Sequence, residues 1–140
     1  MMQFSAIAKA SLEKVWDHLI YKIEHPENFV PGVSNIIILE KNDNFSIRKM
    51  DVLMNGVTET LIEKISFTPY NVRFELVEHP IFIGHVDNDA KFISENETEI
   101  TYTINWINKT TQEPFSNPEL VKNAVLKTIE FITAHQTKTK

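Results

Sequence analysis

The sequence of 140 residues contains no cysteine, and this absence excludes disulfide bonds, thiolate metal sites and thiol nucleophiles. It also has no run of 18 consecutive apolar residues, the length that a membrane-spanning helix requires. The N-terminus lacks the positively charged region and apolar run that begin a secretory signal. We therefore expect a cytoplasmic protein with no stable insertion into a membrane.

Basic residues are also few, with 14 Lys and Arg against 19 Asp and Glu, which gives a net charge of −5 at pH 7. They are scattered rather than gathered in a stripe, so nucleic acid is not an expected partner. Apolar residues make up 42% of the chain and charged residues 24%, which is typical of a soluble globular protein. The length predicts one domain over residues 1–140, and the sequence leaves the oligomeric state open.

The hydrophobic periodicity predicts a strand at the N-terminus, a helix over 12–24 and a second, very short helix over 26–31. Ser11 can cap the first helix, which ends before Pro26 because the residue ahead of a proline avoids the α region. The period then changes to two, and turn signals such as Asn55-Gly56 divide the stretch into strands. We expect six of them: 34–41, 45–54, 57–67, 72–79, 81–93 and 98–107.

A long helix follows Asn117, and its apolar residues cover about half of its circumference, with Thr128 and His135 near the middle. Sequential strands joined by tight turns form an antiparallel sheet with one face that needs cover. We predict an α+β fold in which a curved sheet contacts the helix along both flanks. That geometry can leave an apolar hollow where Thr128 and His135 meet a guest, although side chains could equally fill the space.

The order of elements resembles the helix-grip fold of the SRPBCC (START/Bet v 1-like) superfamily, a seven-stranded antiparallel sheet around a long C-terminal helix, with two short helices after the first strand. Within it, the chain is similar to the AtaL-like branch of largely uncharacterised proteins. This resemblance implies a hydrophobic cavity between sheet and long helix, names no ligand and implies no cofactor. The stretches that carry the similarity to the branch are VWDHLIYKIEHPENFVPGV, SIRKMDV, IEKISFTPYNVRFE and GHVDNDAKF.

Two charged residues stand on strand positions that should face inward. Arg48 shares its parity with Met50, and Glu63 shares its parity with Leu61 and other apolar residues. Burying either charge alone would be costly, so we expect the two to pair or to bind a polar ligand. In one interpretation the pair holds a ligand carboxylate or hydroxyl; in the other it sits at a strand end or a bulge turns one charge outward.

Acid–base chemistry has two candidate residues, Glu63 and His85. Strand alternation places His85 with Asp87 and puts Asn88 on the opposite face, so His85 and Asn88 reach one pocket only through a bulge. His18 and His25 share a face but have no third ligand, so no metal site is expected.

The leading hypothesis is a binding protein for one small hydrophobic molecule. The alternatives are an enzyme acting on a cyclic or polyketide-like substrate, with Arg48 stabilising negative charge, and an interaction module with a vestigial cavity. The side chains expected to contact the molecule are Arg48, Met50, Glu63, Phe74, Tyr102, Trp106, Thr128 and His135.

Overall fold

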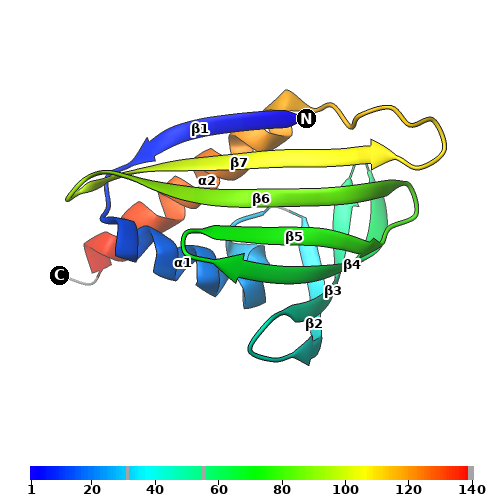
Figure 1. Cartoon of the computed structure of the whole chain (residues 1–140), viewed down its shortest axis with the longest axis horizontal. Coiled ribbons are helices and arrows are strands. Elements are labelled where there is room, and N and C mark those ends of the chain that lie inside the picture. The colour runs from blue at the N-terminus through cyan, green and yellow to red at the C-terminus, as the bar shows by residue number, and fades with distance from the viewer. Residues whose placement is uncertain (31, 55, 139–140) are drawn as a thin grey trace.

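The computed structural model describes residues 1–30, 32–54 and 56–138, except for the side chains of residue 54 and residues 135–138. Seven strands form one antiparallel sheet, as the sequence predicted, and their order is β1-β7-β6-β5-β4-β3-β2 (Figure 1). The strands are β1 (Met2–Ala8), β2 (Val33–Lys41), β3 (Ser46–Met54), β4 (Val57–Thr68), β5 (Asn71–Glu78), β6 (Phe82–Ser94) and β7 (Glu97–Asn108).

Helix α1 (Leu12–Glu24) has the predicted bounds, and the Ser11 hydroxyl accepts from the Lys14 N–H at its first turn. The predicted helix over 26–31 is wrong, because among its described residues, 26–30, only a 3-10 turn, η1 (Pro26–Asn28), forms; residue 31 lies outside the described residues. So short a segment cannot offset the cost of starting an α-helix. Phe29, directly after this turn, is fully buried. Its ring packs against that of Phe131, with 4.6 Å between the ring centroids.

Helix α2 (Pro118–Lys138) lies on the same face of the sheet as α1 (Figure 1). It packs on β1 and β7 along one flank and on α1 along the other. Helix α1 therefore contributes to the cover of α2 besides the sheet. We call the face that both helices cover the inner face. The buried seam of α2 follows the helical repeat through Val121, Val125, Thr128 and Ile132.

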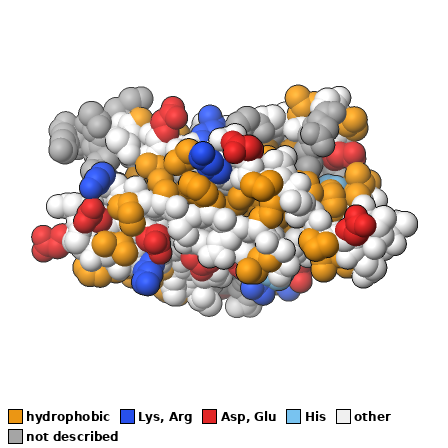
Figure 2. All heavy atoms as spheres, turned by 90° about the horizontal axis from the view of Figure 1, so that it is seen from above, with side chains coloured by type: hydrophobic (Ala, Val, Ile, Leu, Met, Phe, Trp, Pro, Cys, Tyr) orange, Lys and Arg blue, Asp and Glu red, His pale blue; other side chains and the backbone are white. Residues whose placement is uncertain are grey.

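Part of the apolar surface of α2 stays exposed, which explains why its hydrophobic face is wider than its packing seam. Leu120 and Leu126 are 38% and 42% exposed, and Ile7 on the edge strand β1 is 41% exposed. Figure 2 views the molecule from above, on the side of β1 in Figure 1, and hydrophobic side chains form an interrupted band there among charged ones. The wide stripe is therefore only partly a core feature.

At Gly84, β6 leaves no room for a side chain against β7. A Cβ atom at this position would lie 2.0 Å from the Asn105 carbonyl oxygen, and its φ of 123° is unfavourable for other residues. The sequence pattern predicted a bulge or a close approach here, and the close approach is confirmed.

Candidate functional site

The centre of the inner face carries a buried ion pair. Arg48 and Glu63 are directly opposite in the β3–β4 register, and Arg48 Nη2 donates to Glu63 Oε1 at 2.5 Å. Arg48 Nη1 also donates to the Ile23 carbonyl oxygen at 2.8 Å, which satisfies an acceptor in the last turn of α1. Both charges point inward and pair, as the strand parity predicted.

Lys22 brings a second cation to this centre from α1. Its Nζ donates to Asn88 Oδ1 at 2.6 Å and lies 4.2 Å from the centre of the Tyr102 ring and 5.1 Å from that of Phe74. Burial, which is the largest cause, and the charge of Arg48 lower the pKa of Lys22 to about 7, although Glu63 opposes both. The amine is thus poised to change charge near neutral pH.

The donors of this cluster exceed its acceptors. With Lys22 protonated, two cations face the single carboxylate of Glu63. Arg48 Nε and Asn88 Nδ2 are buried and have no hydrogen-bond partner among the described residues. Buried donors of this kind are costly unless an acceptor meets them, and a negatively charged oxygen is the strongest acceptor for a guanidinium and an ammonium.

Apolar and hydroxyl-bearing side chains surround the charges. Phe74 lies under the Arg48 guanidinium, at 5.3 Å from its Cζ to the ring centre. Tyr102 OH and Thr128 Oγ1 are 2.6 Å apart, and Thr128 also donates to the Ala124 carbonyl oxygen at 2.9 Å. Burial raises the pKa of Tyr102, although the bond to Thr128 works in the opposite direction.

The structure separates some of the predicted site residues from this centre. Met50 is buried opposite Leu61, beside the charged pair in the β3–β4 register. Trp106 also faces inward but belongs to a different aromatic cluster, four residues along β7 from Tyr102. The predicted His135 side chain lies outside the described residues.

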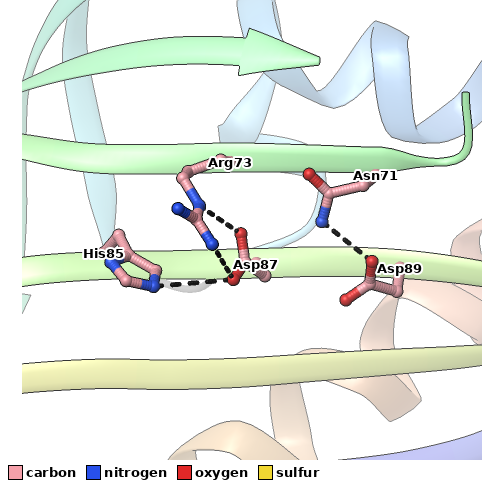
Figure 3. Close-up of polar contacts among 5 residues, drawn as sticks. All are labelled: Asn71, Arg73, His85, Asp87 and Asp89. Carbon is pink, nitrogen blue, oxygen red and sulfur yellow. Dashed lines mark hydrogen bonds and ion pairs between the residues drawn. The ribbon is translucent and has the colours of Figure 1, made fainter. Parts of the chain in front are cut away.

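His85 lies on the outer face of the sheet, which the helices do not cover. Its Nε2 is 3.6 Å from Asp87 Oδ2, and Asp87 is also bonded to Arg73 (Figure 3). The candidate base therefore stands on the opposite side of the sheet from Glu63, because no bulge alters the alternation predicted for β6 at this point. The structure does not bring His85 to the centre.

Sequence reasoning missed the role of Lys22, although a signal was present. Lys22 follows Val15 by seven residues and Leu19 by three, which places it on the buried side of α1. A lysine at such a position normally extends its amine to water, so the pattern alone favours a solvated side chain. Asn88, at an inward position of β6, supplies the acceptor that keeps the amine inside.

Two hollows formed by described residues lie at the surface. One is at the β6–β7 turn beside Lys9, and the other lies between the first residues of β1 and the start of α2. Neither is lined by Lys22, Arg48 or Glu63. Within the described part of the chain, no group of three His, Asp or Glu residues could hold a metal ion, and no helix has the length and apolarity to cross a membrane.

Comparisons with known proteins agree on one fold. A family model described as "AtaL: Acetylaranotin biosynthesis cluster protein L" matches residues 5–137, whereas no curated protein matches the chain. Among solved structures, TTHA0849 from Thermus thermophilus aligns with a TM-score of 0.73 at 12% identity, over 96% of this chain and 97% of that one.

Two further solved structures come from other bacteria. A START superfamily protein from Mycobacterium smegmatis has a TM-score of 0.71 at 14% identity and covers 99% and 97% of the two chains. The Zhui aromatase/cyclase from Streptomyces sp. R1128 has a TM-score of 0.69 at 14% identity and covers 96% and 91%. At these identities the likeness establishes the seven-stranded, helix-covered architecture and leaves the chemistry to the residues of this chain.

Proposed function

The chain belongs to the AtaL family, and from this premise we propose that it binds a small, mostly apolar molecule through an acidic oxygen at the inner-face centre. The observation that carries the proposal is the buried cluster of Lys22, Arg48 and Glu63, with its excess of donors. The fold of the chain is shared with a START superfamily protein and an aromatase/cyclase. Proteins of this superfamily typically hold hydrophobic ligands between the sheet and the long helix.

The chemistry of the cluster favours an anion over a neutral guest. A carboxylate or ionised phenol would accept from Arg48 Nε, Asn88 Nδ2 and Lys22 Nζ, and it would balance the charge of two cations and one carboxylate. The rings of Phe74 and Tyr102 beside these donors would contact the apolar body of the molecule. The ligand class is therefore an aromatic or otherwise apolar acid.

Entry of such a molecule requires side chains to move. The amine of Lys22 occupies the space between the two rings, and its four-carbon stem can rotate away. Phe29 and Phe131, which pack together between η1 and α2, would close behind the ligand. This arrangement makes the segment after α1 the expected entrance.

A matched pair of probes tests the proposal: 2-naphthoic acid and its methyl ester, which differ by the negative charge. Calorimetric titration should show that the acid binds at least about tenfold more tightly, a difference of about 1.4 kcal/mol. The triple variant Lys22→Met/Arg48→Met/Glu63→Leu removes all three charges of the cluster, so none is left unpaired, and it should abolish the preference. The control Arg73→Met, on the outer face, should keep it.

Equal affinity of acid and ester, or no binding of either, would contradict the proposal. The same protein purified from cells should also release an acidic small molecule in native mass spectrometry.

An enzyme of the same fold is the second candidate. The observation that favours it is Lys22, an amine whose pKa of about 7 suits proton transfer near neutral pH, beside Glu63 and Arg48. In that case Arg48 would stabilise negative charge that develops on the substrate. A bound molecule whose mass changes on incubation with the protein would favour this candidate over simple binding.

A further inference from the structure

A second group of buried donors lies on the inner face near the end of β7. The rings of His79 and Trp106 are 5.7 Å apart between centroids, and Phe82 and Phe115 complete an aromatic cluster around them. His79 is 4% exposed and Trp106 is 9% exposed. Both residues carry polar nitrogen atoms into an otherwise apolar environment.

Hydrogen bonds fix which nitrogen of His79 carries the proton. Its Nδ1 accepts from the backbone N–H groups of Ile81 at 3.0 Å and Phe82 at 3.1 Å, so Nδ1 is unprotonated. Burial lowers the pKa of His79, which favours the neutral ring with its single proton on Nε2. This Nε2–H is buried and has no acceptor among the described residues.

Trp106 presents the same deficiency. Its indole Nε1–H can only donate, and it too is buried with no acceptor in the described part of the chain. Two neighbouring donors without an acceptor are uncommon in a protein interior, because each loses its hydrogen bond to water on folding. Both are neutral, so no positive charge of these two residues would offset the cost of burying an anion beside them, and an uncharged acceptor fits better.

We propose that His79 and Trp106 form a binding subsite for the carbonyl oxygen of an aromatic ketone. The oxygen would accept from both N–H groups, and the rings of Phe82 and Phe115 would contact the flat body of the molecule. This inference goes beyond the proposed function, because it concerns other residues and another ligand group. Trp106 stands four residues from Tyr102 on β7, about 13 Å along the strand, so the two sites are separate.

The loop between β7 and α2 supplies the route to this subsite. Phe115 lies on that loop and is tied to β7 by the bond from its N–H to the Trp106 carbonyl oxygen at 2.9 Å. Residues 109–114, just before it, are exposed at the surface. Displacement of Phe115 would open the two donors to a ligand.

The test uses 9-fluorenone and fluorene, two flat molecules that differ by one carbonyl oxygen. Fluorenone should bind the wild-type protein at least about tenfold more tightly than fluorene. It should also shift the indole N–H signal of Trp106 downfield in a ¹⁵N-correlated NMR spectrum, which fluorene should not do. Trp106→Phe keeps the aromatic ring and should reduce the ratio of affinities to near one.

His79→Asn is the matched variant for the other donor. An asparagine can accept from the backbone N–H groups two and three residues ahead, as Asn42 and Asn108 already do in this protein. The variant therefore preserves the turn while it removes the imidazole ring with its Nε2–H. It should lower the fluorenone preference by about as much as Trp106→Phe.

Equal affinities of the two probes for the wild-type protein, binding of neither, or an unchanged ratio in both variants would overturn the inference. In that case the N–H groups would be satisfied by the neighbouring aromatic faces alone. The preference for 2-naphthoic acid over its ester is measured at Lys22 and Arg48, so the two proposals can fail independently.

Discussion

Two arginine–carboxylate pairs lie on opposite faces of the sheet, with similar chemistry in different surroundings. On the outer face, Arg73 donates to Asp87 through Nε at 2.8 Å and Nη2 at 3.0 Å (Figure 3). Its side chain is 50% exposed and that of Asp87 15%. On the inner face the side chains of Arg48 and Glu63 are only 3% and 5% exposed.

Exposure to water gives the two pairs different roles. Water screens the outer pair, which therefore contributes little to folding and mainly sets local charge. Burial raises the pKa of Asp87, but the hydrogen bonds and charge of Arg73 outweigh it, and the net effect is a lowered pKa. Formation of the inner pair removed two charges from water. Replacing such a pair by apolar residues of similar volume often leaves a protein equally stable. A pair kept under such conditions fits a binding role better than a structural one.

Removal of one inner partner should have the largest effect on stability. Arg48→Met leaves the Glu63 carboxylate buried without its cation, and we expect the free energy of unfolding to fall by about 3–5 kcal/mol. Urea denaturation at pH 7 measures the change.

The double variant Arg48→Met/Glu63→Leu is the control for this prediction, because it also removes the carboxylate that the single variant leaves without Arg48. It should recover most of the lost stability. If the double variant were as unstable as the single one, the inner pair would have to be a structural element, and the contrast between the two faces would disappear.

The titration of Lys22 should produce the next largest effect. Its folded pKa of about 7 lies below the ordinary 10.5, so between these values the unfolded chain binds more protons than the folded one. Stability from this group therefore rises with pH above 7, by about 3 kcal/mol at pH 9.5. Below pH 7 both states are protonated, and this contribution stays constant.

Lys22→Met lacks this rise. The free energy of unfolding of the variant should therefore fall further below that of the wild type as the pH increases from 7 to 9.5. Unfolding free energies of both proteins across this range provide the measurement, and His79 titrates in both and cancels. A constant difference would mean that the buried amine keeps its ordinary pKa.

The smallest effect is expected on the outer face. Arg73→Met should change the unfolding free energy by less than about 1 kcal/mol, because the guanidinium is half exposed. The difference should shrink further in 1 M NaCl, where charges are screened within about 3 Å. A loss comparable to that of Arg48→Met would show that exposure does not separate the two pairs.

The sequence predicted the architecture well because its signals are local. Alternation and turn residues placed the ends of the six later strands to within one residue, and the helix over 12–24 has the predicted bounds. The same alternation put Arg48 and Glu63 on the inner side of neighbouring strands. A two-residue turn at the predicted Asn55-Gly56 also fixes the register of β3 and β4, and in the structure this register places Arg48 and Glu63 directly opposite each other.

The parts that sequence reasoning missed depend on contacts between distant segments. Lys22 is buried because Asn88, 66 residues away, accepts its hydrogen bond, and no periodicity records that contact. The sequence marks His79 only as the end of a strand ahead of Pro80. Its hydrogen bond from the Ile81 N–H depends on a turn geometry that one sequence does not reveal. The 3-10 turn at 26–28 differs from the prediction for a local reason. A proline signals where a helix begins but does not specify how far it continues.

The pairing of β1 with β7 has a consequence for the order in which the molecule is assembled. Ser5 is hydrogen-bonded to Thr101, 96 residues later, so the first strand must wait during synthesis until nearly the whole chain has left the ribosome. Until α2 follows, the inner-facing and mostly apolar side chains of β1 and β7 that this helix covers remain in contact with water. A nascent chain arrested before α2 would therefore present these mostly apolar side chains to the cell.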